Sequence, residues 1–428
     1  MRVVDAGSGG ALNNNNANNN NGVRPIERIA RFEYARKAEP LSQGATFPTP
    51  MERKGQRREH LMMVSLSALI SVMDHEYFDK AISYGSMRRA LNKCCLDVRW
   101  KDSVVGYELY APRNTYTLIQ SIRDGTYKIS PYQTFIIYEP KKREIVATRI
   151  RDRQFQMSLC MNGLYDDITE HFIYDNCACQ LGKGTDFALG RVKAHMQKFY
   201  REHGKDGWVM KLDVHHFFPE TRHDVAKAAI GKRVSDPRAR QAVFDVIDSF
   251  DGNKGIGLGS QISQLVELAV LDDLDHFIKE KLRIKHYVRY MDDMIFIHED
   301  RDYLKKCWDI IKEKLRGISL ELNKKSCLYP LRQGVKFLHW RFVLTDTGKI
   351  HQKMDASRIG KERRRLKALL AKEARGEIEE GASERSLQAW DAGAARGDSY
   401  YRRKRMSEFY ERTKGEIYDN FRGTTPEG

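Results

Sequence analysis

The sequence "KHYVRYMDDMIFIHED" constrains this chain most, because it places two adjacent acids between two apolar runs. The runs Tyr287–Met291 and Met294–Ile297 are rich in residues that favour strands. A tight turn between them would place Asp292 and Asp293 at the tip of a β-hairpin. An ordinary turn dipeptide is the alternative, but the flanks are apolar enough to form core strands. We therefore predict a buried hairpin that presents two carboxylates.

A third acid follows a similar apolar run. In "GWVMKLDVHHFF", Trp208–Leu212 has the pattern of a buried strand, and Asp213 comes at its end. Three carboxylates on two neighbouring strand ends can hold two hard divalent cations through oxygen ligands. Without cations the three charges would repel one another. Two metal ions so held can clamp the attacking and leaving oxygens of a phosphoryl displacement, so the pattern indicates nucleotidyl transfer.

The charge of the chain points to a polyanionic partner. The 428 residues carry a net charge of +16, which favours nucleic acid, with an anionic membrane surface as the rival. No apolar run approaches the roughly 18 residues of a spanning helix, and the N-terminus lacks an apolar signal core. We therefore expect a cytoplasmic protein without a membrane partner. The seven irregularly spaced cysteines fit buried thiols in a reducing compartment better than a zinc site.

The order of segments indicates the fold class. From about residue 115 to 345, strand-like and helix-like stretches alternate with short turns, which is typical of an α+β fold. Beyond about residue 350 the chain is charged and helix-prone, and "SYYRRKRMSEFYERTKGEIYDNF" interleaves basic and aromatic residues. We expect a basic helical module there.

Two of these motifs resemble those of reverse transcriptases. "YMDD", Tyr290–Asp293, is similar to the catalytic hairpin of that family, and "KLDVHHFF" is similar to its first palm motif. The resemblance implies a right-hand polymerase with fingers, an antiparallel palm sheet packed on helices, and a helical thumb. The expected division is a polar, disordered tail over 1–58, N-terminal helices and fingers over 59–205, the palm over 206–346, and a basic thumb with a C-terminal tail over 347–428.

The resemblance also implies the catalytic residues. Asp213, Asp292 and Asp293 would be the catalytic metal ligands, with the Val214 carbonyl as a further ligand. The metals would be two Mg²⁺ ions, for which Mn²⁺ can substitute, and the substrates would be dNTPs. Phe218 falls at the position that faces the sugar 2′ side, where a bulky ring would exclude ribonucleotides. A core aromatic is the alternative for Phe218.

Further nucleotide-binding residues are implied by motifs of the fingers and palm. "YEPKKREIVATRIRDRQFQ" resembles the fingers strands and places Lys141 and Arg143 at their turn, where cations could grip a triphosphate. A solvated charged turn is the alternative. Relatives often carry Arg where this chain has Gln180, so Lys183 is another candidate. "LELNKKSCLY" resembles the palm segment after the hairpin and places Lys325 near the nucleotide.

The segments that follow resemble a primer grip and a thumb. In "GVKFLHWRFVL" the primer-grip residues would be Phe337, Leu338 and His339. Relatives usually have Gly in place of His339, so we expect the hairpin to bend differently here. Nucleic-acid contacts are expected from a set of basic thumb residues, with a solvated helix face as the alternative. These residues are Arg363, Arg364, Arg365, Arg402, Arg403, Lys404 and Arg405.

The stretch "GLGSQISQLVELAVLDDLDHFIKEKL" carries the sub-family signal. Its apolar residues from Ile262 to Ile278 have helical spacing, which predicts a core helix. Its G-S-x-x-S-Q form resembles the reverse transcriptases of diversity-generating retroelements. Ser260, Gln261 and Gln264, with Leu258 beside them, would then border the nucleotide and the template base.

That sub-family implies a specific activity. Its enzymes make error-prone cDNA from a template-repeat RNA, misread template adenines, and replace a variable repeat in a target gene by mutagenic retrohoming. The implied partners are the template RNA, the cDNA or primer, and a small basic oligomeric accessory variability protein, in a bacterial, archaeal or phage-encoded system. The N-terminal "GALNNNNANNNNGVRPI" resembles a translated template repeat. The alternatives are a group II intron-like or defence-associated reverse transcriptase, or a catalytically silent RNA-binding scaffold.

Overall fold

The computed structural model of the chain describes residues 77–138, 142–257 and 259–422. They form two compact units. The first unit takes in the described residues up to Asp167, together with Gly231–Asp245 and Gly259–Ile262. The second unit takes in Ile168–Ile230, residues 246–257 and the described residues from Ser263 onward. The predicted tail over 1–58, with its Asn-rich stretch, lies outside the described residues.

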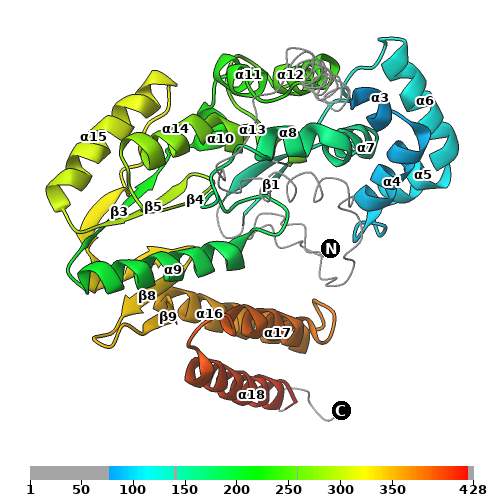
Figure 1. Cartoon of the computed structure of the whole chain (residues 1–428). Coiled ribbons are helices and arrows are strands. Elements are labelled where there is room, and N and C mark those ends of the chain that lie inside the picture. Colours follow the sequence, from blue (N-terminus) through cyan, green and yellow to red (C-terminus); the bar gives the residue numbers. More distant parts are fainter. Residues whose placement is uncertain (1–76, 139–141, 258, 423–428) are drawn as a thin grey trace, which may run out of the picture. The chain divides into compact units, whose positions relative to one another are not determined.

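The first unit consists mainly of helices with one two-stranded antiparallel sheet (Figure 1). Strand β1 (Gln133–Ile137) pairs with β2 (Arg143–Ala147). The helices that begin in this unit are α3 (Phe78–Ala81), α4 (Tyr84–Cys95), α5 (Asp102–Leu109), α6 (Ala111–Arg123), α7 (Ile150–Leu159), η1 (Cys160–Leu164), α8 (Tyr165–Thr169), α12 (Pro237–Asp248) and α13 (Gln261–Val270).

The helices α4, α6 and α7 pack through one buried face each. On α4, Met87, Ala90, Leu91 and Cys94 recur at helical spacing and are buried. The buried amide of Gln154 on α7 donates to the Met87 carbonyl at 3.0 Å and to Thr115 Oγ1 of α6 at 2.9 Å. One side chain thus links the three helices.

The second unit is built on a four-stranded antiparallel sheet in the order β4-β5-β3-β6 (Figure 1). Its strands are β3 (Trp208–Asp213), β4 (His286–Tyr290), β5 (Asp293–His298) and β6 (Cys327–Pro330). The helices around it are α9 (Thr185–His203), α10 (Phe217–Glu220), α11 (His223–Gly231), α14 (Asp272–His276), η2 (Phe277–Lys281) and α15 (Arg301–Gly317).

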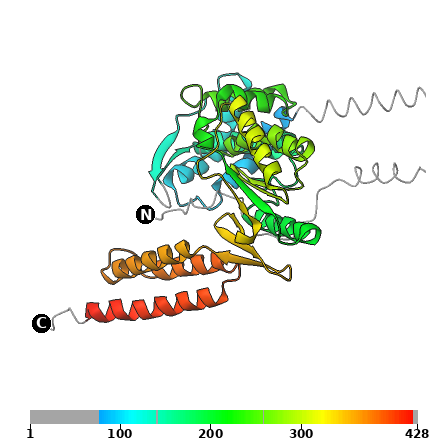
Figure 2. The ribbon, with the colours of Figure 1, turned by 90° about the vertical axis from the view of Figure 1, so that its left-hand side faces the viewer.

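A three-stranded antiparallel sheet and three helices complete this unit. The strands β7 (Val335–Phe337), β8 (Trp340–Leu344) and β9 (Ile350–Met354) follow the short helix η3 (Leu331–Gln333). The helices α16 (Ala356–Ala374), α17 (Ala382–Ala394) and α18 (Tyr400–Arg422) then run side by side (Figure 2). Their shared core contains Leu366, Leu370, Met406 and Tyr410. The combination of helices and antiparallel sheets confirms the predicted α+β class.

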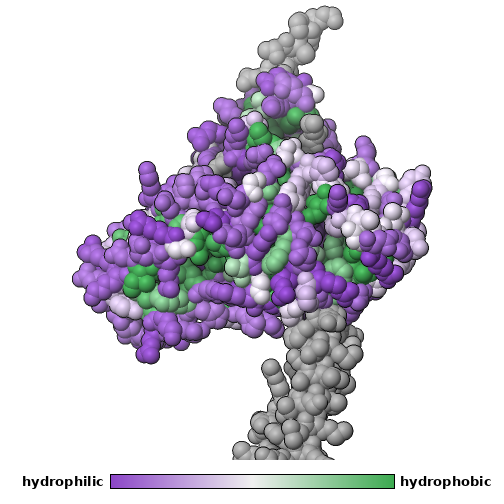
Figure 3. All heavy atoms as spheres, turned by 90° about the horizontal axis from the view of Figure 1, so that it is seen from above, coloured by the Kyte–Doolittle hydropathy of each residue, from purple (hydrophilic) through white to green (hydrophobic). Residues whose placement is uncertain are grey.

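The core of the second unit lies between the two sheets and α9. Val209, Val288 and Ile295 point from the four-stranded sheet toward Val192 and Phe199 of α9. Because side chains alternate along a strand, the neighbours Tyr287 and Arg289 point to the opposite face, where α13 and α14 lie (Figure 1). Hydrophilic residues dominate the surface seen from above, with smaller hydrophobic patches between them (Figure 3). No helix of the described residues is long and apolar enough to cross a membrane.

The predicted core helix from Ile262 to Ile278 is only partly correct. Its apolar residues are buried as expected, with Ile262, Leu268 and Ile278 fully inaccessible. The helix is nevertheless interrupted at Leu271, so that α13, α14 and η2 follow one another. The interruption lets Asp275 face the sheet, where it meets a buried arginine.

A fully buried ion pair joins α14 to the sheet. Arg289 of β4 and Asp275 of α14 are both completely inaccessible, and their atoms approach to 2.6 Å. The Tyr287 hydroxyl donates to the same carboxylate at 2.6 Å, and Arg289 also donates to the Leu268 carbonyl at 3.2 Å. The pair is therefore satisfied by several hydrogen bonds, which offset the cost of burying two charges.

We predict that Asp275→Asn destabilises the second unit by about 3–5 kcal/mol, because it leaves the Arg289 charge buried without a counter-ion. The measurement is the free energy of unfolding in urea. Asp79→Asn is the matched control, since its partner Arg238 and Asp79 are half or more exposed, and its cost should stay below about 1 kcal/mol. Equal effects of the two substitutions would contradict the prediction.

Candidate active site

The three predicted metal-ligand acids lie at one end of the four-stranded sheet. Strands β3 and β5 pair so that Asp213 and Asp293 are direct cross-strand partners. In the β4–β5 hairpin, Tyr290 pairs with Asp293, so Met291 and Asp292 form the two-residue turn. The Val214 amide donates to the Asp292 carbonyl at 3.3 Å, which ties this turn to the end of β3. The tight hairpin predicted from the sequence is present, but the prediction that both acids lie in the turn is wrong. β4 begins and ends one residue earlier than predicted and β5 extends one residue further at each end, so Asp293 is the first residue of β5.

The turn is held by Arg289, a residue that the sequence analysis did not single out. Met291 has a φ of 53°, in the left-handed region that non-glycine residues rarely adopt. Arg289 donates from Nη1 to the Met291 carbonyl at 3.1 Å while its remaining nitrogens bind Asp275. The available signal was a lone Arg within the apolar run "HYVRYM". Such a residue is buried only when it is paired.

Asp293 combines burial with a close cation. Its Oδ2 accepts from Lys211 Nζ at 2.9 Å. Its Oδ1 is buried and has no hydrogen-bond partner among the described residues. Burial raises the pKa of Asp293 to about 6, the Lys211 charge opposes this rise, and the charges of Asp292 and Asp213 add to it. The acids are thus close enough to affect one another electrostatically.

The donors at this site suit a hard divalent cation. Carboxylate and carbonyl oxygens are the ligands that Mg²⁺ accepts, and the unpartnered Asp293 Oδ1 is an oxygen that lacks the partner expected of a buried polar atom. Within the described ranges, however, no three acid, His or Cys side chains already converge on one metal position. Lys211 is the cation that lies against Asp293, at 2.9 Å.

The backbone at Asp213 is fixed by the turn before β6. The Asp213 carbonyl accepts from the Asn323 amide at 2.7 Å, and the Asp213 amide donates to Ser326 Oγ at 3.2 Å. The predicted nucleotide-binding residue Lys325 lies in this turn with an exposed side chain. Lys325 therefore lies two residues after Asn323, whose amide binds the backbone carbonyl of Asp213.

Phe218 lies five residues beyond Asp213, in α10. The residue His216 before this helix has a φ of 43°, which bends the chain sharply after β3. Phe218 is half-buried, whereas its neighbour Phe217 is buried. The two rings meet edge to face at 5.9 Å. A half-buried ring can present a surface to a ligand, while Phe217 fits the description of a core aromatic.

Lys183 is engaged within the protein. Its Nζ donates to the Asn176 carbonyl and to Gln180 Oε1, both at 3.0 Å. It also lies over the rings of Tyr174 and Phe187 at 5.6 and 5.7 Å. Burial lowers its pKa. To grip a triphosphate, Lys183 would have to give up these contacts, which makes it a weaker candidate than the sequence suggested.

The other predicted nucleotide-binding cations belong to the first unit. Arg143 is the first residue of β2, is exposed, and pairs across the strands with Ile137. The two strands predicted around the turn with Lys141 and Arg143 are therefore present as β1 and β2. Lys141 lies outside the described residues.

The sub-family motif begins with a close backbone approach. Gly259 has a φ of 138°, and a Cβ there would lie 2.6 Å from the Val146 carbonyl oxygen of β2, so only glycine fits. Ser260 is buried and donates from Oγ to Gln156 Oε1 at 2.8 Å. The Gln261 Oε1 atom is buried without a described partner. Gln264, one turn along α13, is half-buried in the second unit, and Leu258 lies outside the described residues.

The predicted primer-grip residues form the β7–β8 hairpin. Phe337 pairs with Trp340, which leaves Leu338 and His339 as the two-residue turn. Both turn residues have positive φ values, of 45° and 67°. His339 thus adopts the left-handed conformation that glycine would adopt more readily.

The basic residues predicted to bind nucleic acid divide into two groups. Arg402 donates to the Met354 carbonyl, and Arg403 forms a two-pronged ion pair with Asp391, so both are engaged within the protein. Arg363 lies over the Phe409 ring at 5.1 Å. The side chains that remain exposed are Arg363, Arg364, Arg365, Lys404 and Arg405. These five are the better candidates for phosphate contacts.

A buried glutamate near the acids was missed. Glu267 of α13 is fully inaccessible, and its Oε2 accepts from Thr221 Oγ1 at 2.9 Å. Its Oε1 has no partner in the described part of the chain. Burial raises the pKa of Glu267 well above its usual range, and the Asp292 charge acts in the same direction. A lone acid on the apolar face of "QISQLVELAV" was the signal for this residue.

The chain is similar to known polymerases. Residues 140–342 match the family model described as reverse transcriptase (RNA-dependent DNA polymerase). Among curated proteins, no sequence matches the chain. The matched segment contains the four-stranded sheet and all three acids, so the prediction of a polymerase-like α+β fold is confirmed.

Several solved structures resemble the chain at low identity. Telomerase from Candida albicans, in complex with a fragment of telomeric RNA, is 9% identical with a TM-score of 0.42, over 69% of this chain and 62% of that one. Apo telomerase from Candida tropicalis is 12% identical with a TM-score of 0.44, over 68% and 62%. The Sicinivirus RNA-dependent RNA polymerase is 15% identical with a TM-score of 0.45, over 72% and 69%. The matched region thus spans less than two thirds of either telomerase chain.

The order of the acids, their pairing across β3 and β5, and the family match over the same segment agree with one another. Over residues 140–342, the chain is therefore similar to the reverse transcriptase family.

Proposed function

We propose that this protein is an RNA-directed DNA polymerase that extends a primer by two-metal-ion nucleotidyl transfer. The observation that carries the proposal is the direct cross-strand pairing of Asp213 with Asp293, beside a turn that contains Asp292. This arrangement lies in the segment that matches the reverse transcriptase family. The substrates are dNTPs, and the template is RNA.

In the proposed mechanism, Asp213, Asp292 and Asp293 would hold two Mg²⁺ ions, with the Val214 carbonyl as a further ligand. Bound there, the ions would supply Lewis-acid chemistry for nucleotidyl transfer. Lys211 favours the charged form of Asp293, since its charge opposes the rise in pKa that burial causes. Arg289 positions the turn through the Met291 carbonyl. Phe218 limits the space at the sugar 2′ side.

The nucleotide and the nucleic acid are proposed to bind through basic side chains. Arg143, Lys141 and Lys325 are the candidates for the triphosphate, and the five exposed basic residues of α16 and α18 are the candidates for the backbone of the hybrid. The fingers, palm and thumb are proposed to correspond to residues 59–205, 206–346 and 347–428.

The finer proposal is that the enzyme serves a diversity-generating retroelement. Support comes from the G-S-x-x-S-Q form over Gly259–Gln264 and from the Asn-rich N-terminal sequence. The enzyme would then copy a template-repeat RNA with errors at adenines and work with a small basic accessory protein. An intron-like or defence-associated reverse transcriptase is the alternative within the family.

Asp292→Asn is expected to reduce dNTP incorporation by at least about 10³-fold, since it removes one charged ligand from a site that supplies several kcal/mol to the transition state. The assay is Mg²⁺-dependent primer extension on an RNA template. Asp302→Asn is the matched control, because this acid is exposed on the surface of α15. An Asp292→Asn protein with full activity would refute the metal-site assignment. Wild-type protein that binds RNA but never extends a primer would favour the silent scaffold.

Phe218→Ala is expected to raise incorporation of ribonucleotides relative to deoxyribonucleotides by about tenfold or more, because it removes the bulk that excludes a 2′-hydroxyl. The ratio of kcat/KM for rNTP and dNTP measures the effect. Phe218→Tyr keeps the ring and should keep the discrimination. An unchanged ratio in Phe218→Ala would instead assign this side chain to the core.

Sequencing of cDNA tests the sub-family. The template is an RNA that contains equal numbers of the four bases, and the accessory protein is supplied if the neighbouring DNA encodes one. We expect misincorporation to concentrate opposite template adenines. Errors spread evenly over the four bases would remove the retroelement proposal but leave the polymerase proposal intact.

A further inference from the structure

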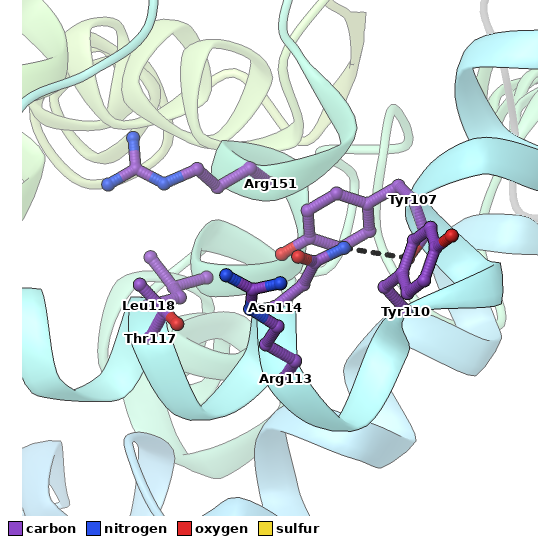
Figure 4. Close-up of a pocket in the computed structure, with 7 residues that line it drawn as sticks. All are labelled: Tyr107, Tyr110, Arg113, Asn114, Thr117, Leu118 and Arg151. Carbon is purple, nitrogen blue, oxygen red and sulfur yellow. Dashed lines mark hydrogen bonds between the residues drawn. The ribbon is translucent and has the colours of Figure 1, made fainter.

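A second candidate site lies in the first unit, on α5 and α6, which precede the family match, and on α7, which lies within it. Figure 4 shows a pocket of about 330 Å³, a size at the lower end of the range for ligand sites. Three helical elements and the junction between α5 and α6 contribute to it. The lining residues are Tyr107, Tyr110, Arg113, Asn114, Thr117, Leu118 and Arg151.

One wall of the pocket is fixed by hydrogen bonds. The Tyr107 hydroxyl donates at 2.9 Å to Gln154 Oε1, whose amide nitrogen is itself buried and bound to α4 and α6. Asn114 Nδ2 donates at 2.9 Å to the Tyr107 carbonyl (Figure 4). The ring of Tyr107 and the amide of Asn114 are therefore held in place before any ligand arrives, which lowers the entropic cost of binding.

The remaining polar groups are available. Arg113 is exposed, and no hydrogen bond or ion pair within the described residues engages its guanidinium. Arg151 reaches in from α7 on the opposite side, as Figure 4 shows. Its Nη1 donates to the Lys128 carbonyl and Ser130 and lies 3.7 Å from Asp152, and the guanidinium lies over the Tyr127 ring at 5.0 Å, so Nη2 and Nε remain for a ligand. The Tyr110 ring at the α5–α6 junction is 60% exposed. None of the seven lining residues is acidic.

This combination matches the chemistry of a nucleotide. Two guanidinium groups on opposite walls suit a phosphate, because Arg binds phosphate oxygens through two parallel donors. An exposed tyrosine ring suits a base, because unpaired bases stack on aromatic side chains in single-stranded RNA recognition. The fixed amide of Asn114 keeps an oxygen free to accept a hydrogen bond from a base edge or a 2′-hydroxyl.

We propose that this pocket binds one nucleotide of a single-stranded RNA segment, with the base on Tyr110 and the phosphate between Arg113 and Arg151. This inference goes beyond the proposed function. It rests on that function in one respect, which is the choice of RNA as the polyanion that binds. Two further exposed aromatic residues are close to the lining residues along the sequence. They are Trp100, whose ring centroid lies 5.2 Å from Lys101 Nζ, and Tyr116 on α6. Interleaved aromatic and basic residues are typical of surfaces that bind single strands.

Photocrosslinking tests the location of the RNA. The full-length protein is mixed with a short single-stranded RNA that carries 4-thiouridine, in EDTA so that no polymerisation takes place. After irradiation, crosslinked peptides are mapped by mass spectrometry. We expect crosslinks at Tyr110 or Tyr107. Absence of any crosslink between residues 100 and 123, when crosslinks form elsewhere on the protein, would overturn the proposal.

Fluorescence anisotropy with the same RNA tests the energetics. Tyr110→Ala should weaken binding by about fivefold or more through loss of a stack, and Tyr110→Phe should restore it. Arg113→Ala should weaken binding and lower the slope of log affinity against log salt by about 0.7. Arg123→Ala is the matched control, because Arg123 is exposed on the same helix but does not line the pocket.

The outcomes separate this inference from the polymerase proposal. Wild-type affinity and salt slope in both Tyr110→Ala and Arg113→Ala would overturn the RNA site, and a protein partner would then be the better occupant. Circular dichroism checks that the variants are folded. If the wild-type protein failed to extend any primer but still crosslinked at Tyr110, the RNA site would stand and the polymerase proposal would fall.

Discussion

The buried ion pair between Arg289 and Asp275 is the interaction on which the candidate site depends. Two unpaired charges could not remain at zero accessibility, so the helix that carries Asp275 and the strand that carries Arg289 must stay together. The same guanidinium holds the Met291 carbonyl at the hairpin turn. A contact that belongs to the core thereby fixes the backbone from which Asp292 and Asp293 project.

The electrostatics of the site follow from crowding acids at the end of a buried sheet. Asp293 is buried deeply enough that its pKa rises to about 6, and Lys211 is the cation that opposes this rise. One carboxylate oxygen is satisfied by Lys211 and the other has no described partner. Burial and the neighbouring acids disfavour the charged form of Asp293. A bound cation would offset both effects, which is a physical reason why such a site can attract a metal ion.

Local sequence patterns predicted much of this arrangement. Apolar alternation and a two-residue turn are short-range features, so the β4–β5 hairpin and the strand before Asp213 could be read directly, to within one residue at the ends. The turn at Leu338–His339 was less predictable. The sequence, which lacks glycine there, did not predict that His339 would take a left-handed conformation between the paired residues Phe337 and Trp340.

The sequence by itself determined the acids, their order, and the strands that carry them, because these depend on residue type and on periodicity along the chain. Only the tertiary structure decided which charges meet. It pairs Arg289 with Asp275 and Lys211 with Asp293, and it assigns Lys183 to contacts within the protein. These pairings join residues that are separated along the chain. They are settled by burial and by the need to satisfy every buried charge, neither of which a local pattern contains.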